Sequence, residues 1–294
     1  MRETISVREA SNGWVPCKGG ATGGRMRRLL VLVSMAVLVT ACGGAGSGDS
    51  LLDKKTLVVG VRPDLPGLGL KTKDGQFVGF DVDVARYIAD RLGKKVTFTQ
   101  VLAADRIPSL LEHKTDMVLA TLSVTPDRKT QISYAGPYYL SYQDILVRSE
   151  DSAVRTIRDL KGRSFCTVKG SDATARLAAV DGMSARLVPA ADYNECMTKI
   201  RTRRVDAITT NDVILAGLIK RAGGGLRLVN AKFAEQRTGI GIRKGDPDAC
   251  EALNKAITQM YYDGTAARLV HKWFDGTGLD ESIIEVPQLE GCDD

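Results

Sequence analysis

The chain has 294 residues, with 41 Lys and Arg against 35 Asp and Glu, which gives a formal net charge of +6. Residues 1–41 hold six of the basic and two of the acidic side chains, so the remainder has 35 against 33, a net charge of +2. So small an excess excludes a strongly basic nucleic-acid-binding protein and predicts no nucleic-acid partner. The roughly 250 residues that follow are enough for two lobes.

An apolar run near the N-terminus is typical of a lipoprotein signal peptide. Residues 26–42 read MRRLLVLVSMAVLVTAC, in which two arginines precede an apolar run that ends in small residues and a cysteine. The run is shorter than the roughly 20 residues that span a membrane. We therefore predict a leader over 1–41, with the signal peptide proper at 26–41. Lipidation of Cys42 would anchor the protein to the extracytoplasmic face of the cell membrane.

The next segment, 42–55, begins with a run of Gly and Ser and predicts a flexible tether. Beyond it, short apolar runs of β type alternate with helical patterns. The β-type runs are 57–61, 95–101, 116–121, 163–168, 186–189 and 205–210. This alternation predicts an α/β fold with mainly parallel sheets.

One helix is marked by its apolar periodicity. The apolar side chains recur with helical spacing at Phe80, Val84, Tyr87, Ile88 and Leu92, and Gly93 provides the stop. Two acids, Asp81 and Asp83, fall in the first turn of this helix. We interpret them as surface acids that complement the helix dipole, with a ligand role as the alternative.

Four cysteines remain after the leader and Cys42, and they are Cys166, Cys196, Cys250 and Cys292. Four cysteines allow three pairings. We favour Cys166 with Cys196, because both fall in one predicted lobe, and Cys292 would then join Cys250. No cysteine pair has metal-ligand spacing and the two histidines are isolated, so we predict neither a metal site nor a cofactor.

Three segments resemble the landmarks of one protein family. GFDVDVARYIADRLG at 79–93, the segment 120–147 and VDAITTNDVILAGL at 205–218 have the order and spacing found in family 3 of the extracellular solute-binding proteins. These proteins are the receptors of polar amino-acid ABC importers. The resemblance implies a periplasmic-binding-protein-like type II fold, in which two α/β lobes are joined by a two-strand hinge and the ligand lies between them.

The same resemblance assigns the lobes. Lobe 1 would comprise 56–145 and 240–294, and lobe 2 would comprise 146–239. The chain would cross between the lobes near 144–148 and return through 239–243. The closing helices, from about 246 to 274, would pack on lobe 1.

The resemblance also implies a site for a zwitterion. Arg128 would bind the ligand carboxylate with its planar guanidinium, and Ser123 and Thr121 lie in the same segment. The alternative is that Arg128 only caps or solvates the start of a helix. From lobe 2, the free backbone N–H groups of a strand-to-helix loop would bind the same carboxylate, with candidates Ser171, Asp172, Ala173 and Thr174. Simple N-capping by Ser171 or Asp172 is the alternative there.

The position expected for the ammonium group departs from the family pattern. Many relatives carry an aspartate where this chain has Asn211, with Asp212 immediately after it. Either Asp212 turns toward the ligand or the ammonium is held more weakly than usual.

Side-chain selectivity is expected from Arg62, which follows the first β-type run, and from Arg106 near a helix start. A cation at Arg62 suits a second carboxylate on the ligand. The alternative is that Arg62 pairs with Asp64 or another acid at the surface.

These features together predict a lipid-anchored, monomeric binding component of an ABC importer for acidic amino acids, with a membrane permease as its partner. Glutamate and aspartate are the expected ligands, and glutamine and asparagine remain alternatives. No Ser/His/Asp or Cys/His constellation is present, so we predict no enzyme activity. A same-fold enzyme such as a cyclohexadienyl-type dehydratase and a ligand sensor for a signalling partner remain alternative functions.

Overall fold

The computed structural model describes residues 50–277, 279, 283 and 285–292. The predicted leader, 1–41, and the predicted lipidation site, Cys42, lie outside these residues. Within the described part, no helix combines the length and apolar character that crossing a membrane requires.

The main sheet contains two sets of parallel strands. The order across the sheet is β5 (Lys95–Gln100), β1 (Thr56–Val61), β6 (Met117–Val118), β12 (Phe233–Ile242), β7 (Ser133–Arg148), β10 (Ala207–Asn211), β8 (Ser164–Val168) and β9 (Arg186–Ala190), while β11 (Leu226–Leu228) pairs with β7. We refer to β1, β5 and β6 as the strands of lobe 1, and to β8, β9 and β10 as the strands of lobe 2. Neighbours within each set are parallel, as the alternating pattern predicts.

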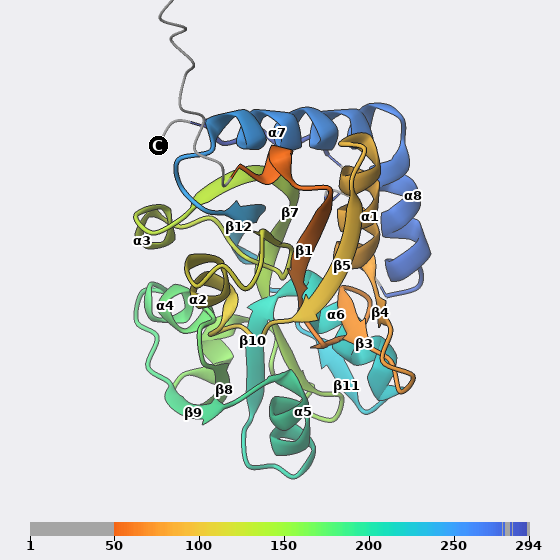
Figure 1. Cartoon of the computed structure of the whole chain (residues 1–294). Helices are drawn as coiled ribbons and strands as arrows, with labels where there is room; N and C mark the ends of the chain where they lie inside the picture. Colours follow the sequence, from red (N-terminus) through yellow and green to blue (C-terminus); the bar gives the residue numbers. More distant parts are fainter. Residues whose placement is uncertain (1–49, 278, 280–282, 284, 293–294) are drawn as a thin grey trace, which may run out of the picture. The chain divides into compact units, whose positions relative to one another are not determined.

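The two long antiparallel strands β7 and β12 connect these sets (Figure 1). Their mutual pairing joins 133–143 to 233–242. The end of β7 pairs with β10, and the end of β12 pairs with β6. Of the predicted crossing segments, 144–148 pairs with β10 and β11, and the end of 239–243 pairs with β6. The exact lobe limits stay a prediction.

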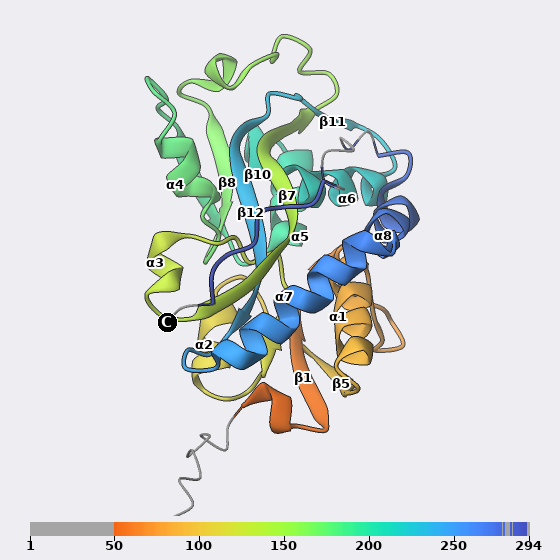
Figure 2. The ribbon, with the colours of Figure 1, turned by 90° about the horizontal axis from the view of Figure 1, so that it is seen from above.

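Helices flank the strands on both sides. Lobe 1 carries α1 (Phe80–Arg91), α2 (Arg106–Leu111), α3 (Pro126–Lys129), α7 (Pro247–Tyr262) and α8 (Thr265–Phe274), and lobe 2 carries α4 (Ala173–Ala178), α5 (Tyr193–Arg201) and α6 (Asp212–Ala222). The predicted α1 is confirmed, and the chain leaves it at Gly93 with a φ of 65°. As Figure 2 shows, α7 lies beside α1, so the closing helices pack on lobe 1 as expected.

The interpretation of Asp81 as a surface acid is wrong. Asp81 is completely buried and accepts a hydrogen bond of 2.9 Å from the Tyr138 hydroxyl. Burial raises the pKa of Asp81 to about 7. The reason is the helical period, since Asp81 lies four residues before Ala85 and seven before Ile88 and therefore shares their buried face. Asp83 lies nearer the surface, where it pairs with a lysine and an arginine of the chain.

The end of the predicted tether, 42–55, is folded. Residues Leu51–Asp53 form a short 3₁₀-helix with a buried Leu51. Asp246, at the start of α7, accepts bonds from the Ser50 hydroxyl at 3.0 Å and the Leu51 N–H at 2.9 Å. The predicted tether therefore extends too far toward its C-terminal end. Its Gly and Ser content did not reveal that Leu51 is buried or that Ser50 and Leu51 bond to Asp246.

Both predicted disulfides are present. Cys166–Cys196 joins β8 to α5, and Cys250–Cys292 joins α7 to the C-terminal segment. Most predicted strands are confirmed, but the one expected over 116–121 covers only Met117–Val118. After β6 the chain turns away from the sheet, and Thr121 adopts a φ of 52°. That turn begins the site described next.

Candidate functional site

A small cavity lies where the parallel strands of both lobes end. Its lining residues are Arg62, Ala103, Arg106, Thr121, Ser123, Ser171, Asp172, Tyr193, Thr210, Asn211, Ile214 and Gln236. The carboxyl ends of β1, β6, β8 and β10 lead into several of these positions, which is where open α/β sheets place ligands. The cavity has a volume of about 10 Å³, room for about one water molecule. Any larger ligand therefore needs these side chains or the lobes to move apart.

The sequence prediction and the cavity overlap substantially. Seven predicted residues line it, and they are Arg62, Arg106, Thr121, Ser123, Ser171, Asp172 and Asn211. Arg128, Ala173, Thr174 and Asp212 do not line it. Ala173, Thr174 and Asp212 directly follow lining residues in the same helix starts, whereas Arg128 lies within α3, five residues after the lining residue Ser123.

Arg62 combines both roles weighed for it. It is 1% exposed and lines the cavity, and it also forms an ion pair with Asp64. Its Nε lies 2.8 Å from Oδ1 of Asp64, and its Nη2 lies 2.6 Å from Oδ2. The expected pair is thus present but in the interior instead of at the surface. On the other side, the guanidinium carbon lies 5.8 Å from the ring centre of Tyr193, which comes from lobe 2.

Arg106 bonds to backbone carbonyls of both lobes. Its Nη1 donates to Thr121 at 2.6 Å and its Nη2 donates to Gly170 at 2.8 Å, while Nε donates to Ala103. Burial lowers the pKa of Arg106 to about 9, and the positive charges of Arg128 and Arg62 act in the same direction. All three side-chain nitrogens of Arg106 already donate to carbonyls. Arg106 therefore contributes mainly positive potential and a hydrogen bond between the lobes, and not a free donor for the ligand.

Arg128 does not line the cavity, but it contacts two lining residues, Ser123 and Asp172, and bonds across the lobes. Its Nη1 donates to the Ser123 carbonyl at 2.8 Å and its Nη2 to the Gly170 carbonyl at 3.1 Å. Its Nη1 also lies 3.9 Å from a carboxylate oxygen of Asp172. The start of α3 is capped by Thr125, whose hydroxyl accepts from the Arg128 N–H. The side chain of Arg128 is therefore not the cap.

The lobe 2 loop at the start of α4 has fewer free N–H groups than predicted. The Ser171 hydroxyl accepts from the Ala173 N–H at 3.2 Å, although Asp172 holds the N-cap position of α4, and the ligand role of Ser171 stays a prediction. The Asp172 side chain makes no capping bond and instead binds Arg176, with Nε at 3.0 Å. Ser171 and Asp172 still line the cavity, whereas Thr174 does not.

The two candidates for the ammonium group lie differently. Asn211 lines the cavity, and its amide accepts from the Val213 N–H at 2.9 Å and donates to the Ser141 hydroxyl. Asp212 is buried next to it without lining the cavity, and burial raises its pKa to about 6. Among the described lining residues, Asp172 is the one carboxylate. An ammonium group in the cavity would therefore meet Asp172 and Asn211 before Asp212.

Sequence reasoning missed five lining residues: Ala103, Tyr193, Thr210, Ile214 and Gln236. The Tyr193 hydroxyl donates to Thr210 at 2.6 Å, which fixes the ring beside Arg62. One end of the Gln236 amide accepts from Ser123 at 3.2 Å, and the other end is buried without a hydrogen-bond partner in the described part of the chain. Gln236 and Thr238 are both buried and lie two residues apart, on the same face of β12. This two-residue period is the sequence signal that could have identified Gln236.

The charges around the cavity favour anionic groups. The guanidinium groups of Arg62 and Arg128 lie close enough to lower the pKa of Arg106, and the acids near these arginines include Asp64, Asp172 and the buried Asp81. Such a field attracts carboxylates and opposes a cationic side chain. In the described part of the chain no three His, Cys, Asp or Glu side chains are grouped so that they would hold a metal ion.

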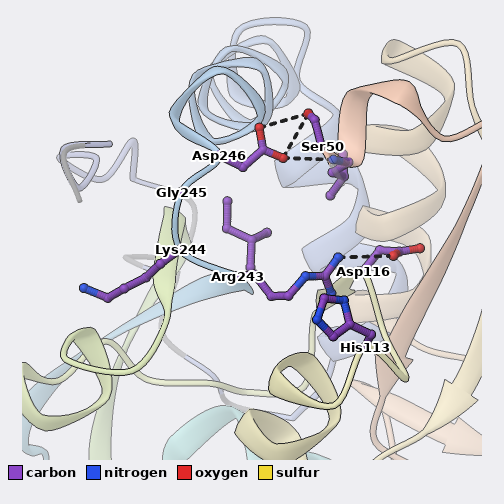
Figure 3. Close-up of a pocket in the computed structure, with 9 residues that line it drawn as sticks. Ser50, His113, Asp116, Arg243, Lys244, Gly245 and Asp246 are labelled. Atoms are coloured by element: carbon purple, nitrogen blue, oxygen red, sulfur yellow. Dashed lines mark hydrogen bonds and ion pairs between the residues drawn. The ribbon is translucent and has the colours of Figure 1, made fainter. Parts of the chain in front are cut away.

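A larger surface pocket lies elsewhere, at the start of α7 (Figure 3). It has a volume of about 360 Å³, and several of its charged groups already have partners. Asp246 accepts from Ser50, while Asp116 lies 2.6 Å from Lys54 and 3.7 Å from Arg243. It is also next to the N-terminal ends of β1 and β6, opposite the end where α/β sheets place ligands. Its size therefore does not make it the ligand site.

Comparison with known proteins agrees with this geometry. Residues 57–276 match the model of the bacterial extracellular solute-binding proteins, family 3. The glutamate-binding protein GluB of Corynebacterium efficiens is 32% identical over 279 residues, which cover 88% of this chain and 93% of that protein.

Two solved structures share the fold. An ancestral arginine-binding protein bound to arginine has a TM-score of 0.70 and 31% identity, covering 75% of this chain and 99% of that one. AncCDT-1, an ancestral amino acid-binding protein described as a precursor of cyclohexadienyl dehydratase, has a TM-score of 0.68 and 30% identity, covering 75% and 96%. The fold is thus the type II fold of periplasmic amino-acid binding proteins, with two α/β lobes. This chain belongs to family 3 of the bacterial extracellular solute-binding proteins.

Proposed function

We propose that this protein is the binding component of an ABC importer for acidic amino acids, with glutamate or aspartate as ligand. The observation that carries the proposal is that Arg62 and Arg106 line one cavity between the lobes, while Arg128 lies close enough to lower the pKa of Arg106. An amino acid with two carboxylates supplies two anionic groups to this field. A cationic amino acid would place a like charge beside three guanidinium groups.

The lining residues support a division of the ligand groups. Arg128 and Ser123 are suited to the α-carboxylate, and the unpartnered end of the Gln236 amide adds a polar contact. Asp172 and Asn211 are suited to the ammonium group. Arg62 is suited to the side-chain carboxylate, because Asp64 takes only two of its donors.

The relatives support this choice without requiring it. GluB is a glutamate-binding protein, whereas another family relative, ArtP of Bacillus subtilis at 29% identity, is an arginine-binding protein. Ligand charge therefore varies within the family. The positive field of this cavity favours the acidic ligand over the basic one. The side-chain amide of glutamine or asparagine is uncharged and has a single acceptor oxygen, so it would accept fewer of the arginine N–H groups.

A thermal-shift screen of the purified protein against the twenty amino acids tests the proposal. Glutamate or aspartate at 100 times its dissociation constant should stabilise the protein by about 2.7 kcal/mol. Calorimetry then compares glutamate with glutamine in wild type and in Arg62→Gln. The variant should weaken glutamate by about 1.5 to 3 kcal/mol and glutamine much less. A wild-type preference for arginine, or equal losses for both ligands, would contradict the acidic assignment.

A catalytic activity is the second candidate, because AncCDT-1 is described as a dehydratase precursor. Such chemistry needs an acid or base aimed at the substrate. The carboxylate of Asp172 is already held by Arg176, and no histidine or cysteine is among the described lining residues. We therefore propose binding without turnover. Product formation from a prephenate-like substrate, followed by absorbance, would overturn this part of the proposal.

We further propose that Cys42 carries the lipid anchor on the extracytoplasmic face of the cell membrane. The protein would act as a monomer that closes its lobes on the ligand and presents both lobes to an ABC permease. The sequence pattern at 26–42 supports the anchor. Lobe closure is supported by β7 and β12, which pair with each other and join the strands of lobe 1 to those of lobe 2.

A further inference from the structure

Asp64 pairs with Arg62 but does not itself line the cavity. Both residues are buried, with exposures of 4% and 1%, yet Arg62 lines the cavity and Asp64 does not. The ion pair uses the Nε and Nη2 of Arg62, which form one edge of the guanidinium. The edge formed by Nη1 and the second Nη2 hydrogen has no hydrogen-bond partner among the described residues. That edge has the geometry to bind a second carboxylate with two parallel bonds.

The local backbone holds the pair rigidly. Asp64 starts β2 (Asp64–Leu65), which pairs with β3 (Gly69–Lys71) in a three-stranded sheet completed by β4 (Phe77–Val78). The Lys71 N–H donates to the carbonyl of Pro63, between the two paired residues. A side chain at Gly69 would come within 2.6 Å of the Arg62 carbonyl, so β3 lies directly against Arg62. Asp64 is therefore fixed by a hairpin that does not depend on the ligand.

We infer that Asp64 is a positioning residue that sets selectivity for a second carboxylate by holding Arg62 with its free edge toward the cavity. The inference rests on the proposed function, since it concerns how the same site recognises an acidic side chain. A buried guanidinium without a partner is costly and turns toward whatever acceptor it can reach. Asp64 supplies a charged acceptor to Nε and Nη2, and the Tyr193 ring lies near the guanidinium without taking a donor, so Nη1 stays available to a ligand.

The test measures the ratio of glutamate to glutamine affinity by calorimetry in four proteins: wild type, Asp64→Asn, Asp64→Ala and Asp64→Ala with Arg62→Gln. Wild type should prefer glutamate by about tenfold or more, as expected for one charge-assisted pair. Asp64→Ala should reduce the preference to within about threefold. Asp64→Asn should keep part of it, because the amide oxygen still accepts from Arg62. With Arg62→Gln in place, Asp64→Ala should change the ratio no further.

Asp83→Asn is the matched control, because Asp83 is also an ion-paired acid of lobe 1 but lies outside the cavity lining. It should leave the affinity ratio unchanged. A glutamate preference that persists in Asp64→Ala would show that Arg62 needs no support, and one that increases would show that Asp64 competes with the ligand for Arg62. Either result would overturn the inference and leave the proposed function standing. A wild-type protein without preference for glutamate would overturn both.

Discussion

The arginines around the cavity differ in what holds each guanidinium. Arg106 is saturated by carbonyls, Arg62 is held by a carboxylate, and Arg128 bonds to the carbonyls of Ser123 and Gly170. Arg106 and Arg128, both from lobe 1, donate hydrogen bonds to the carbonyl of Gly170 in lobe 2. Substitution at Arg128 should therefore affect both the ligand and the contact between the lobes.

For Arg128→Ala we expect ligand affinity to fall by about 2 to 5 kcal/mol, the usual cost of truncating one partner of a buried charged hydrogen bond. Calorimetry with the ligand found in the screen measures this loss. Lys129→Ala is the control, since Lys129 is the next residue of α3 and pairs with Glu290 away from the cavity. Equal affinities for wild type and Arg128→Ala would exclude Arg128 from the site.

Asp81 should make stability depend on pH. Its pKa is raised by burial from 3.8 to about 7, although Tyr138, Arg62 and Arg106 act in the opposite direction. The folded state therefore binds one proton more than the unfolded state between pH 4 and pH 7, so stability is lost as pH rises through this range. Asp81→Asn cannot titrate and should flatten the profile, by on the order of 1 to 4 kcal/mol between pH 4 and pH 8. Urea unfolding at several pH values checks this, and parallel profiles would contradict it.

At the scale of elements, glycines allow the lobes to meet. Gly170, in the loop before α4, has a φ of 80°, and a Cβ there would lie 2.6 Å from the backbone of Ala104. Gly217, inside α6, faces Pro66 of lobe 1, and a Cβ there would lie 1.9 Å from the Pro66 carbonyl oxygen. Neither close approach tolerates an additional methyl group without separation of the two elements.

Gly217→Ala should therefore affect ligand binding through lobe closure without lowering the stability of the ligand-free protein. Alanine is favoured over glycine in a helix by up to about 1 kcal/mol, so the ligand-free protein should keep or gain thermal stability. Ligand affinity should fall at least tenfold, because the added Cβ pushes α6 away from Pro66. Differential scanning calorimetry and titration with ligand measure the two effects. Unchanged affinity would mean that the ligand-bound lobes do not approach as closely as they do here.

The Cys166–Cys196 bridge ties β8 to α5, the helix that begins with Tyr193. It closes a loop of 30 residues, which the chain-entropy model values at roughly 3 to 4 kcal/mol. A Cys166→Ala, Cys196→Ala double variant should lose about that much stability. Peptide mapping of the unreduced exported protein should find this pair and Cys250–Cys292. A bridge between Cys166 and Cys250 would contradict the fold itself.

At the scale of the whole molecule, the described part of the chain begins at Ser50, eight residues after Cys42 in sequence. If Cys42 carries the anchor, a Cys42→Ser variant should be released from the membrane fraction while its ligand affinity stays unchanged. Fractionation of expressing cells with immunodetection measures the release. Persistent membrane association of the variant would move the anchor elsewhere.

The sequence alone determined the class of fold and the family. The apolar periodicity of α1, the alternating β-type runs and the spacing of three family segments are local properties, and the two-lobe fold follows from them. The disulfide pairs were predictable because each joins positions within one predicted part of the chain. The loops of the site were predictable as well, since ligands bind where parallel strands end.

Only the tertiary structure decided which side chain in each loop faces the cavity. Asn211 and Asp212 are adjacent in sequence, and the rotation at the start of α6 makes Asn211 a lining residue and buries Asp212 beside it. Tyr193 and Gln236 come from segments without family landmarks and reach the cavity through packing of α5 and the course of β12. The buried partner of Arg62 depends on the β2–β3 hairpin. Orientation and long-range packing are not local properties, which is why sequence patterns located these loops but did not resolve their contacts.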